Sequence, residues 1–348
     1  MQDNNFNPRM VILARESRGI NQTELARRLD ISQPTISRIE DGVSLCPPEM
    51  QEAIADALSY PISFFSQDWD IEGNPAQLFR RRKTISKSIV NKALSRMSII
   101  RNQISQLIDL VEHQPVSLPQ FDTEDFEGGA EEVARRTRVA LKIPDGPIIK
   151  PIKHIEKAGC IVVLFDFETN KIDAFSTWAG DIPLIFLNSC ACPSRQRFNL
   201  AHELGHLVMR HLPGYDNAEE EANLFASEFL APFSDIKHML LPLKLDRLGQ
   251  LKIHWKISMR AIVYKAHKKG IISGYKNENL MKQINFRGVS EPHEEHLNLD
   301  DPRLVKELVG ILKDKRGFST EDLVRKTHVY EDEFTLNFVH NSRFRLVV

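Results

Sequence analysis

Residues 197–206, RFNLAHELGH, carry two histidines four positions apart, His202 and His206. In a helix, residues with this spacing lie on one face, so both imidazoles can bind the same metal ion. Glu203 follows His202 directly, and its carboxylate can act there as a general base toward a water molecule. The surrounding apolar residues predict a buried helix, in which Gly205 lets a neighbouring backbone come close. We therefore expect a metal-dependent hydrolase site on one helix, and the imidazole ligands favour zinc.

A third protein ligand is expected downstream, because catalytic zinc usually takes three protein ligands and one water. Residues 219–221 are three glutamates that open a second predicted helix after the turn at 213–214. If this helix returns antiparallel, it brings one of them to the ion. On a helical projection, Glu219 lies nearer the middle of the apolar face than Glu221 does. The residues therefore favour Glu219 slightly and leave Glu221 open.

Other reactive side chains lie close to this segment. His211 and Tyr215 follow the first helix, where either can donate a hydrogen bond to a tetrahedral oxyanion or simply pack. Cys190 and Cys192 precede it, and a thiolate there can occupy the open zinc position and hold the site latent. The alternative is that all four cysteines of the chain are free thiols in a reducing compartment.

A second motif lies near the start of the chain, at residues 22–42, QTELARRLDISQPTISRIEDG. Residues 22–29 predict a first helix capped by Asn21, residues 30–32 a turn, and Ser32 caps a second helix. The exposed residues near the start of a recognition helix read base edges in the major groove. Here these residues are Gln33, Pro34, Thr35, Ser37 and Arg38. The alternative is a helical domain that packs on the rest of the chain and never touches DNA.

The chain divides by pattern into four parts of an α+β protein. An all-helical domain spans residues 8–67, and a basic helical linker spans 79–114, with an arginine and lysine run at 80–83. A domain with a small sheet spans 130–275, because residues 148–188 hold β-branched apolar runs beside the predicted metal helix. A helical region follows at 276–348.

Composition excludes some classes of protein. The 348 residues carry a formal net charge of −1, so a uniformly basic nucleic-acid coat is excluded while a local basic patch is not. No segment approaches the roughly 18 apolar residues of a membrane helix. The first residues lack the apolar core of a secretory signal, and a cytoplasmic protein without membrane contact is expected.

Several of these segments together resemble a known family. Residues 197–206, followed by EANLFA at 221–226 and LAP at 230–232, resemble the ImmA/IrrE metallopeptidases. IEKAGC at 155–160 also fits that pattern, and the resemblance covers about residues 130–275. The motif at 22–42 resembles the helix-turn-helix of Cro/Xre-type repressors.

The ImmA/IrrE resemblance implies a zincin-like fold and a ligand set. Thermolysin-like peptidases, which the family is similar to, place the ligand glutamate four residues before an aspartate that supports a metal-bound histidine. Glu219 stands four before Asn223, so the supporting residue here is a neutral amide. The resemblance thus implies that His202, His206 and Glu219 bind Zn²⁺ and that Glu203 is the general base in peptide-bond hydrolysis.

The two motifs together predict a DNA-binding regulator with a zinc metalloendopeptidase domain. Its expected partners are DNA and a protein substrate of the repressor type, and a homodimer is expected because helix-turn-helix repressors read paired half-sites. One alternative is a non-enzymatic transcriptional regulator or antitoxin that uses the peptidase-like domain for sensing or binding. The other is a protease that DNA activates allosterically.

Overall fold

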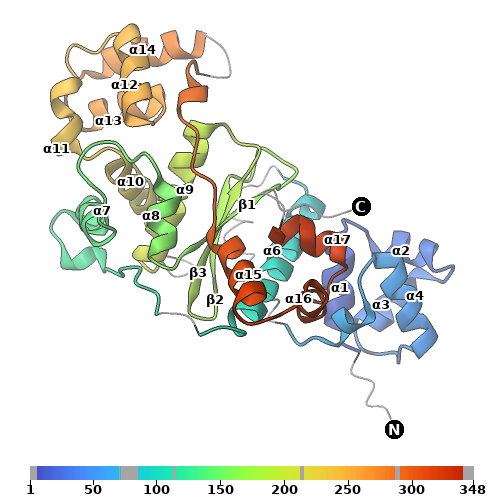
Figure 1. Ribbon diagram of the computed structural model, residues 1–348. Coiled ribbons are helices and arrows are strands. Elements are labelled where there is room, and N and C mark those ends of the chain that lie inside the picture. The colour runs from blue at the N-terminus through green and yellow to red at the C-terminus, as the bar shows by residue number, and fades with distance from the viewer. Residues whose placement is uncertain are drawn as a thin grey trace. The chain divides into compact units, whose positions relative to one another are not determined.

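The computed structural model describes residues 6–69, 71, 85–112, 115–211, 215–286 and 291–339. Its contacts divide the chain into two compact units. The described residues are mostly helical, with one three-stranded sheet (Figure 1), so the predicted fold class is confirmed. None of the described helices is long and apolar enough to cross a membrane.

The first unit comprises Met1–Gln114, Asp166–Lys171 and Leu304–Val348, and it is built from helices. Asn21 caps α2 as predicted, since its side chain accepts a hydrogen bond from the Glu24 amide. Ser32 lies at the N-cap of α3 but makes no capping bond, because its hydroxyl pairs with Thr35 instead. The elements are α1 (Pro8–Ser17), α2 (Gln22–Arg28), α3 (Gln33–Glu40), α4 (Pro48–Leu58), η1 (Ile62–Ser66), α6 (Lys87–Ile108), α15 (Leu304–Asp314), α16 (Thr320–Thr327), α17 (Glu331–Phe334) and a π-helical turn, η5 (Thr335–Val339).

Helix α6 differs from the basic linker expected over 79–114. It packs against α1, α15 and α16 and contributes to the core of the first unit. Arg96 is buried and donates to the Asp166 carbonyl and to Glu168, and Arg101 is also buried. These two arginines are therefore unavailable to DNA phosphates. The basic run at 80–83 lies outside the described residues, and the predicted domain boundaries stay predictions.

The second unit comprises Pro115–Phe165 and Ile172–Arg303, and it holds the sheet. The strand order is β1-β3-β2, with β3 parallel to β1 and antiparallel to β2. Every residue of β3 is buried, which explains its continuous apolar sequence. The elements are η2 (Thr123–Asp125), α7 (Gly129–Ala140), α8 (Pro151–Lys157), β1 (Ile161–Phe165), β2 (Ala174–Ala179), β3 (Ile182–Asn188), α9 (Pro193–Val208), α10 (Ala218–Leu230), α11 (Phe233–Ile236), η3 (Lys237–Met239), α12 (Leu245–Trp255), α13 (Met259–Lys268), α14 (Gly274–Phe286) and η4 (Glu294–His296).

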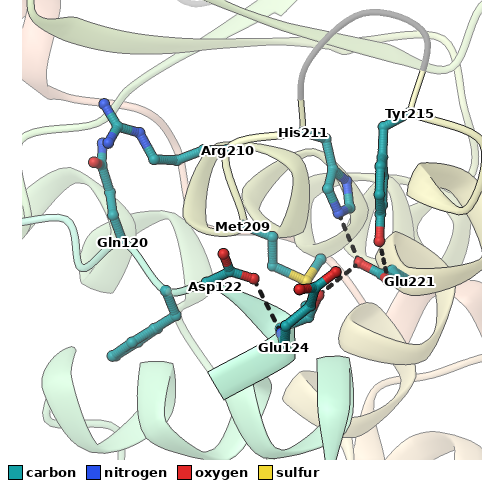
Figure 2. A pocket seen from close by; sticks show the side chains of 10 residues that line it. Gln120, Asp122, Glu124, Met209, Arg210, His211, Tyr215 and Glu221 are labelled. Atoms are coloured by element: carbon teal, nitrogen blue, oxygen red, sulfur yellow. Dashed lines mark hydrogen bonds and ion pairs between the residues drawn. The ribbon is translucent and has the colours of Figure 1, made fainter. Parts of the chain in front are cut away.

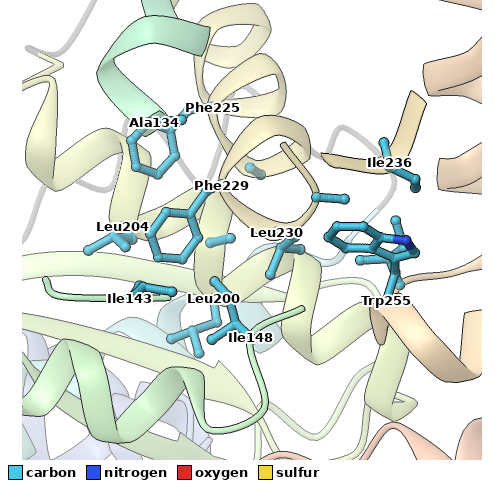
Figure 3. Close-up of a cluster of buried hydrophobic side chains, with 14 of the residues drawn as sticks. Ala134, Ile143, Ile148, Leu200, Leu204, Phe225, Phe229, Leu230, Ile236 and Trp255 are labelled. Carbon is cyan, nitrogen blue, oxygen red and sulfur yellow. The ribbon is translucent and has the colours of Figure 1, made fainter. Parts of the chain in front are cut away.

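Helix α9 lies between the sheet and α10, and the core of the second unit forms around it. Leu200 and Leu204 of α9 meet Phe225 and Phe229 of α10, and all four side chains are buried (Figure 3). Gly205 makes the close approach possible, but the group that uses the space is the Phe225 ring rather than a neighbouring backbone. A Cβ atom on Gly205 would lie 2.9 Å from Cδ1 of that ring.

Gly205→Ala is therefore expected to destabilise the second unit. The added methyl group displaces the Phe225 ring, and overpacking of this kind costs about 1–3 kcal/mol. That cost exceeds the roughly 1 kcal/mol by which alanine favours a helix over glycine. Urea unfolding measures the effect. Gly310→Ala in α15 is the matched control, because a Cβ there meets no atom within 4 Å. If both variants unfolded at the same urea concentration, the Phe225 ring would not restrict the space beside Gly205.

A buried ion pair holds the C-terminal end of α10. Glu228 accepts hydrogen bonds from Lys265 at 2.7 Å, from Arg135 at 2.9 Å and from the Phe233 amide at 3.0 Å. Burial by itself raises the pKa of the Glu228 carboxyl. The charge and hydrogen bond of Lys265 and the other two donors lower this pKa by more, so it lies below its usual value. The pair therefore connects α10 to α13 across the core.

Glu228→Gln is expected to destabilise the protein by about 3–5 kcal/mol, because it leaves the buried Lys265 ammonium without a carboxylate. Denaturant unfolding followed by circular dichroism measures this loss. The double variant Glu228→Gln with Lys265→Met removes the uncompensated charge and should regain part of the stability. A double variant less stable than Glu228→Gln alone would argue against a charge effect.

Candidate metal centre

Helix α9 places His202 and His206 on one face, as the spacing predicts. Their Nε2 atoms lie 3.1 Å apart, and both residues are buried. Helix α10 returns beside α9 and brings Glu219 to the same point. One Glu219 oxygen lies 3.6 Å from His202 Nε2, and the other lies 3.4 Å from His206 Nε2. Two nitrogens and one carboxylate thus converge from two helices.

This group fits a metal ion. Zinc bonds of about 2.0–2.2 Å in tetrahedral geometry place ligand atoms roughly 3.3–3.5 Å apart, close to the observed separations. Among the described residues, His202, His206 and Glu219 form a candidate metal group whose ligand atoms lie within 4.8 Å of one another. The Glu219 side chain is 49% exposed, so the group is reachable from solvent.

Asn223 supports His202 from behind. Its Oδ1 lies 3.1 Å from His202 Nδ1, one helical turn beyond Glu219 on α10. An amide oxygen only accepts, so this contact requires a proton on Nδ1 and makes Nε2 the unprotonated nitrogen, the form that can bind a metal. This contact matches the supporting position that the family resemblance implies.

His206 is supported differently, by a chain that the sequence did not predict. Its Nδ1 lies 2.9 Å from Nδ1 of His211, whose Nε2 lies 3.0 Å from a Glu221 oxygen. Tyr215 donates to the other Glu221 oxygen at 2.9 Å (Figure 2). Thr123 donates at 3.3 Å to the oxygen that His211 contacts. Glu221 therefore lies on the Nδ1 side of His206, connected to it through His211, whereas Glu219 lies beside the Nε2 atoms of both histidines.

The same contacts bear on the two roles left open for His211 and Tyr215, donation to an oxyanion or packing. Both imidazole nitrogens of His211 are engaged, one with His206 and one with Glu221. The Tyr215 hydroxyl already donates to Glu221, and this bond raises the pKa of the phenol. In this arrangement neither side chain is oriented to donate to an oxyanion. A pocket of about 460 Å³ adjoins them, lined also by residues 120–124 and 209–210.

Glu203 is 5% exposed and lies next to the metal group on α9. Ser176, on β2, donates a 2.6 Å hydrogen bond to Glu203 Oε2. This contact arises because the sheet packs directly on α9. The bond orients the Glu203 carboxylate. Ser176 lies 27 residues away in the sequence, so no local pattern could reveal it.

The two cysteines before α9 are far from the metal group. Cys192 is the N-cap of α9, and at 1.5 Å per residue the helix places His202 about 15 Å further along. Cys190 precedes Cys192, and both thiols are exposed. This separation excludes either thiolate as a metal ligand in the described structure.

In the first unit, α3 carries the predicted DNA-binding residues. Pro34 and Arg38 are exposed, and Gln33, Thr35 and Ser37 are half-buried. A chain of hydrogen bonds positions Gln33. Arg15 donates to Glu40, Gln22 donates to Glu40 at 2.8 Å, and Gln33 donates to Gln22 at 2.7 Å.

Comparison with known families agrees with both sites. A model described as an IrrE N-terminal-like domain, of a peptidase family, matches residues 155–267, which include the whole metal group. The chain carries an IrrE N-terminal-like domain. A second model, described as a helix-turn-helix, matches residues 11–65. No curated protein and no solved structure matches the chain. The two family matches show that the chain joins a helix-turn-helix DNA-binding domain to a metallopeptidase-like IrrE domain.

Proposed function

We propose that the IrrE N-terminal-like domain is a zinc metalloendopeptidase that hydrolyses a peptide bond in a partner protein. The observation that carries the proposal is the convergence of His202, His206 and Glu219 with Glu203 held beside them. A binding domain has no need for a buried carboxylate directly after the first histidine. Two imidazoles and one carboxylate with an open position are typical of catalytic zinc sites.

The proposed mechanism assigns a role to each side chain. When zinc is bound, it supplies a Lewis acid that polarises the scissile carbonyl and makes water more acidic. The Glu203 carboxylate takes the proton from the attacking water and then donates it to the leaving amine nitrogen. Ser176 keeps that carboxylate oriented, while Asn223 and His211 keep the two histidines in the tautomers that bind metal.

We further propose that the helix-turn-helix domain binds DNA through Gln33, Pro34, Thr35, Ser37 and Arg38. Arg38, which is exposed, can contact a phosphate or guanine, and Gln33 can read adenine. A protein that joins such a domain to a peptidase is suited to act on other DNA-bound regulators, so a repressor is the proposed substrate class. A homodimer would match the paired half-sites that such domains read.

Cleavage assays test the proposal. The full-length chain, loaded with zinc, is incubated with repressor-type proteins and with a peptide library, and the products are identified by mass spectrometry. Wild type should cleave and Glu203→Gln should not. If both proteins bind zinc and neither cleaves any substrate, the enzyme proposal is wrong and a sensing or binding role replaces it.

DNA added to the same assay addresses the remaining alternative. An operator role predicts a sequence-specific footprint with an unchanged cleavage rate. Allosteric activation predicts a rate that rises with single- or double-stranded DNA. Arg38→Ala should weaken binding in both cases, so the rate measurement separates the two roles.

A further inference from the structure

The η4 turn, Glu294–His296, and His293 directly before it present one glutamate to the interior and three other ionisable side chains to solvent. Glu294 accepts hydrogen bonds from the Ser194 amide at 2.9 Å and from its hydroxyl at 2.7 Å. Lys252, which is fully buried, donates to Glu294 at 2.6 Å and to Glu291 at 3.0 Å. The turn is therefore attached to the first turn of α9 and to α12.

A second anchor fixes the residues before the turn. Glu291 accepts from the Met259 amide at 2.7 Å and from the Arg260 amide at 3.1 Å, at the start of α13. The His293 ring lies against α12, 3.6 Å from the place where a Cβ on Gly249 would stand. The backbone from 291 to 296 is thus held by buried charged contacts on the inside, which preorganises its outer face.

The outer face brings together His293, Glu295 and His296. The ring centroids of His293 and His296 lie 6.1 Å apart, so the two histidines are neighbours on this face. Glu295 Oε1 lies 3.4 Å from His296 Nε2 and 3.9 Å from His293 Nδ1. All three offer a ligand atom within 4.8 Å of one another, and all three residues are exposed.

We propose that His293, Glu295 and His296 form a second binding site for a divalent transition metal, of which zinc is the test case. Imidazole nitrogens suit zinc, copper and nickel, and a carboxylate oxygen completes a three-ligand set. Ligand atoms on a tetrahedral ion lie roughly 3.3–3.5 Å apart, so the observed distances need only a small closure. Water completes the coordination, because the site faces solvent.

The site is expected to bind more weakly than the α9 group. Its ligands are 43%, 69% and 51% exposed, and their side chains lose more freedom on binding than buried histidines do. Because Glu294 connects the turn to Ser194, a metal bound there stabilises the attachment of α9. The inference does not depend on peptidase activity.

Metal stoichiometry tests the inference on the full-length chain, stripped with a chelator and titrated with Zn²⁺. Wild type should bind two equivalents, as measured by calorimetry and by elemental analysis, with the weaker equivalent raising the melting temperature further. His293→Ala with His296→Ala should bind one equivalent and lose the second step. His238→Ala with His254→Ala, which removes two other exposed histidines of the same unit, should still bind two.

A fourth protein separates the two metal sites. His202→Ala with His206→Ala should retain the weaker equivalent and lose the tighter one. If this variant and wild type bind the same number of ions, the α9 proposal fails, and the turn site is judged by the His293→Ala with His296→Ala variant. If His293→Ala with His296→Ala binds as many ions as wild type, the second site does not exist. Equal melting temperatures of the metal-free proteins check that all of them are folded.

Discussion

Glu203→Gln is expected to slow peptide-bond hydrolysis about 10²- to 10⁴-fold, the usual contribution of a general acid–base group. The amide has almost the same shape as the carboxylate but cannot take a proton from water. It can still accept the hydrogen bond from Ser176, so the local structure should be preserved. Metal binding should not change, since the metal group is His202, His206 and Glu219.

The value of kcat/KM on a cleaved peptide measures this effect, with metal content and melting temperature determined on the same samples. Ser176→Ala is the matched comparison, because it removes only the group that orients Glu203. It should reduce kcat less than Glu203→Gln does and leave KM nearly unchanged. A Glu203→Gln variant with wild-type turnover would exclude Glu203 as the base. Loss of metal together with activity would instead make Glu203 structural.

The parts of the site that could be predicted from sequence are those set by helical geometry. His202 and His206 share a face because they are four residues apart. Helical periodicity left Glu219 and Glu221 both open, and the family resemblance implied Glu219, whose two oxygens lie 3.6 and 3.4 Å from the histidine nitrogens. The helix-turn-helix followed from the same kind of local pattern. The shared face of the two histidines follows from the helix period alone, which explains why it agrees with the structure.

The parts that could not be predicted depend on contacts between distant segments. Ser176 reaches Glu203 only because β2 packs on α9. For His211 the sequence left an oxyanion contact and simple packing both open, because its place behind His206 depends on contacts made after α9 ends. Residues 79–114 were predicted to be a basic helical linker, because their sequence does not show that Arg96 of α6 pairs with Glu168 and donates to the Asp166 carbonyl.

The choice between Glu219 and Glu221 leads to the second large effect. Glu219→Gln should abolish tight metal binding, since it removes the carboxylate that lies within 3.6 Å of both histidine Nε2 atoms. Glu221→Gln should lower metal affinity only about 10- to 100-fold, the usual cost of losing a group that supports a metal-bound histidine. Glu220→Gln, in the exposed residue between them, is the control and should leave affinity unchanged.

Competition with a chromophoric chelator measures all three affinities on the same scale, and the spectrum of the cobalt-substituted protein reports the ligand geometry. Glu221→Gln should retain a four-coordinate spectrum, because His211 can still contact His206 when its own support weakens. Glu219→Gln should lose that spectrum. If the two variants exchanged these results, Glu221 would be the ligand, and α10 would have to rotate by about 200° at 100° per residue, taking Asn223 away from His202. Glu219 and Asn223 lie on one face of α10, so an experiment that identifies Glu219 as the ligand also supports Asn223 as the residue that supports His202.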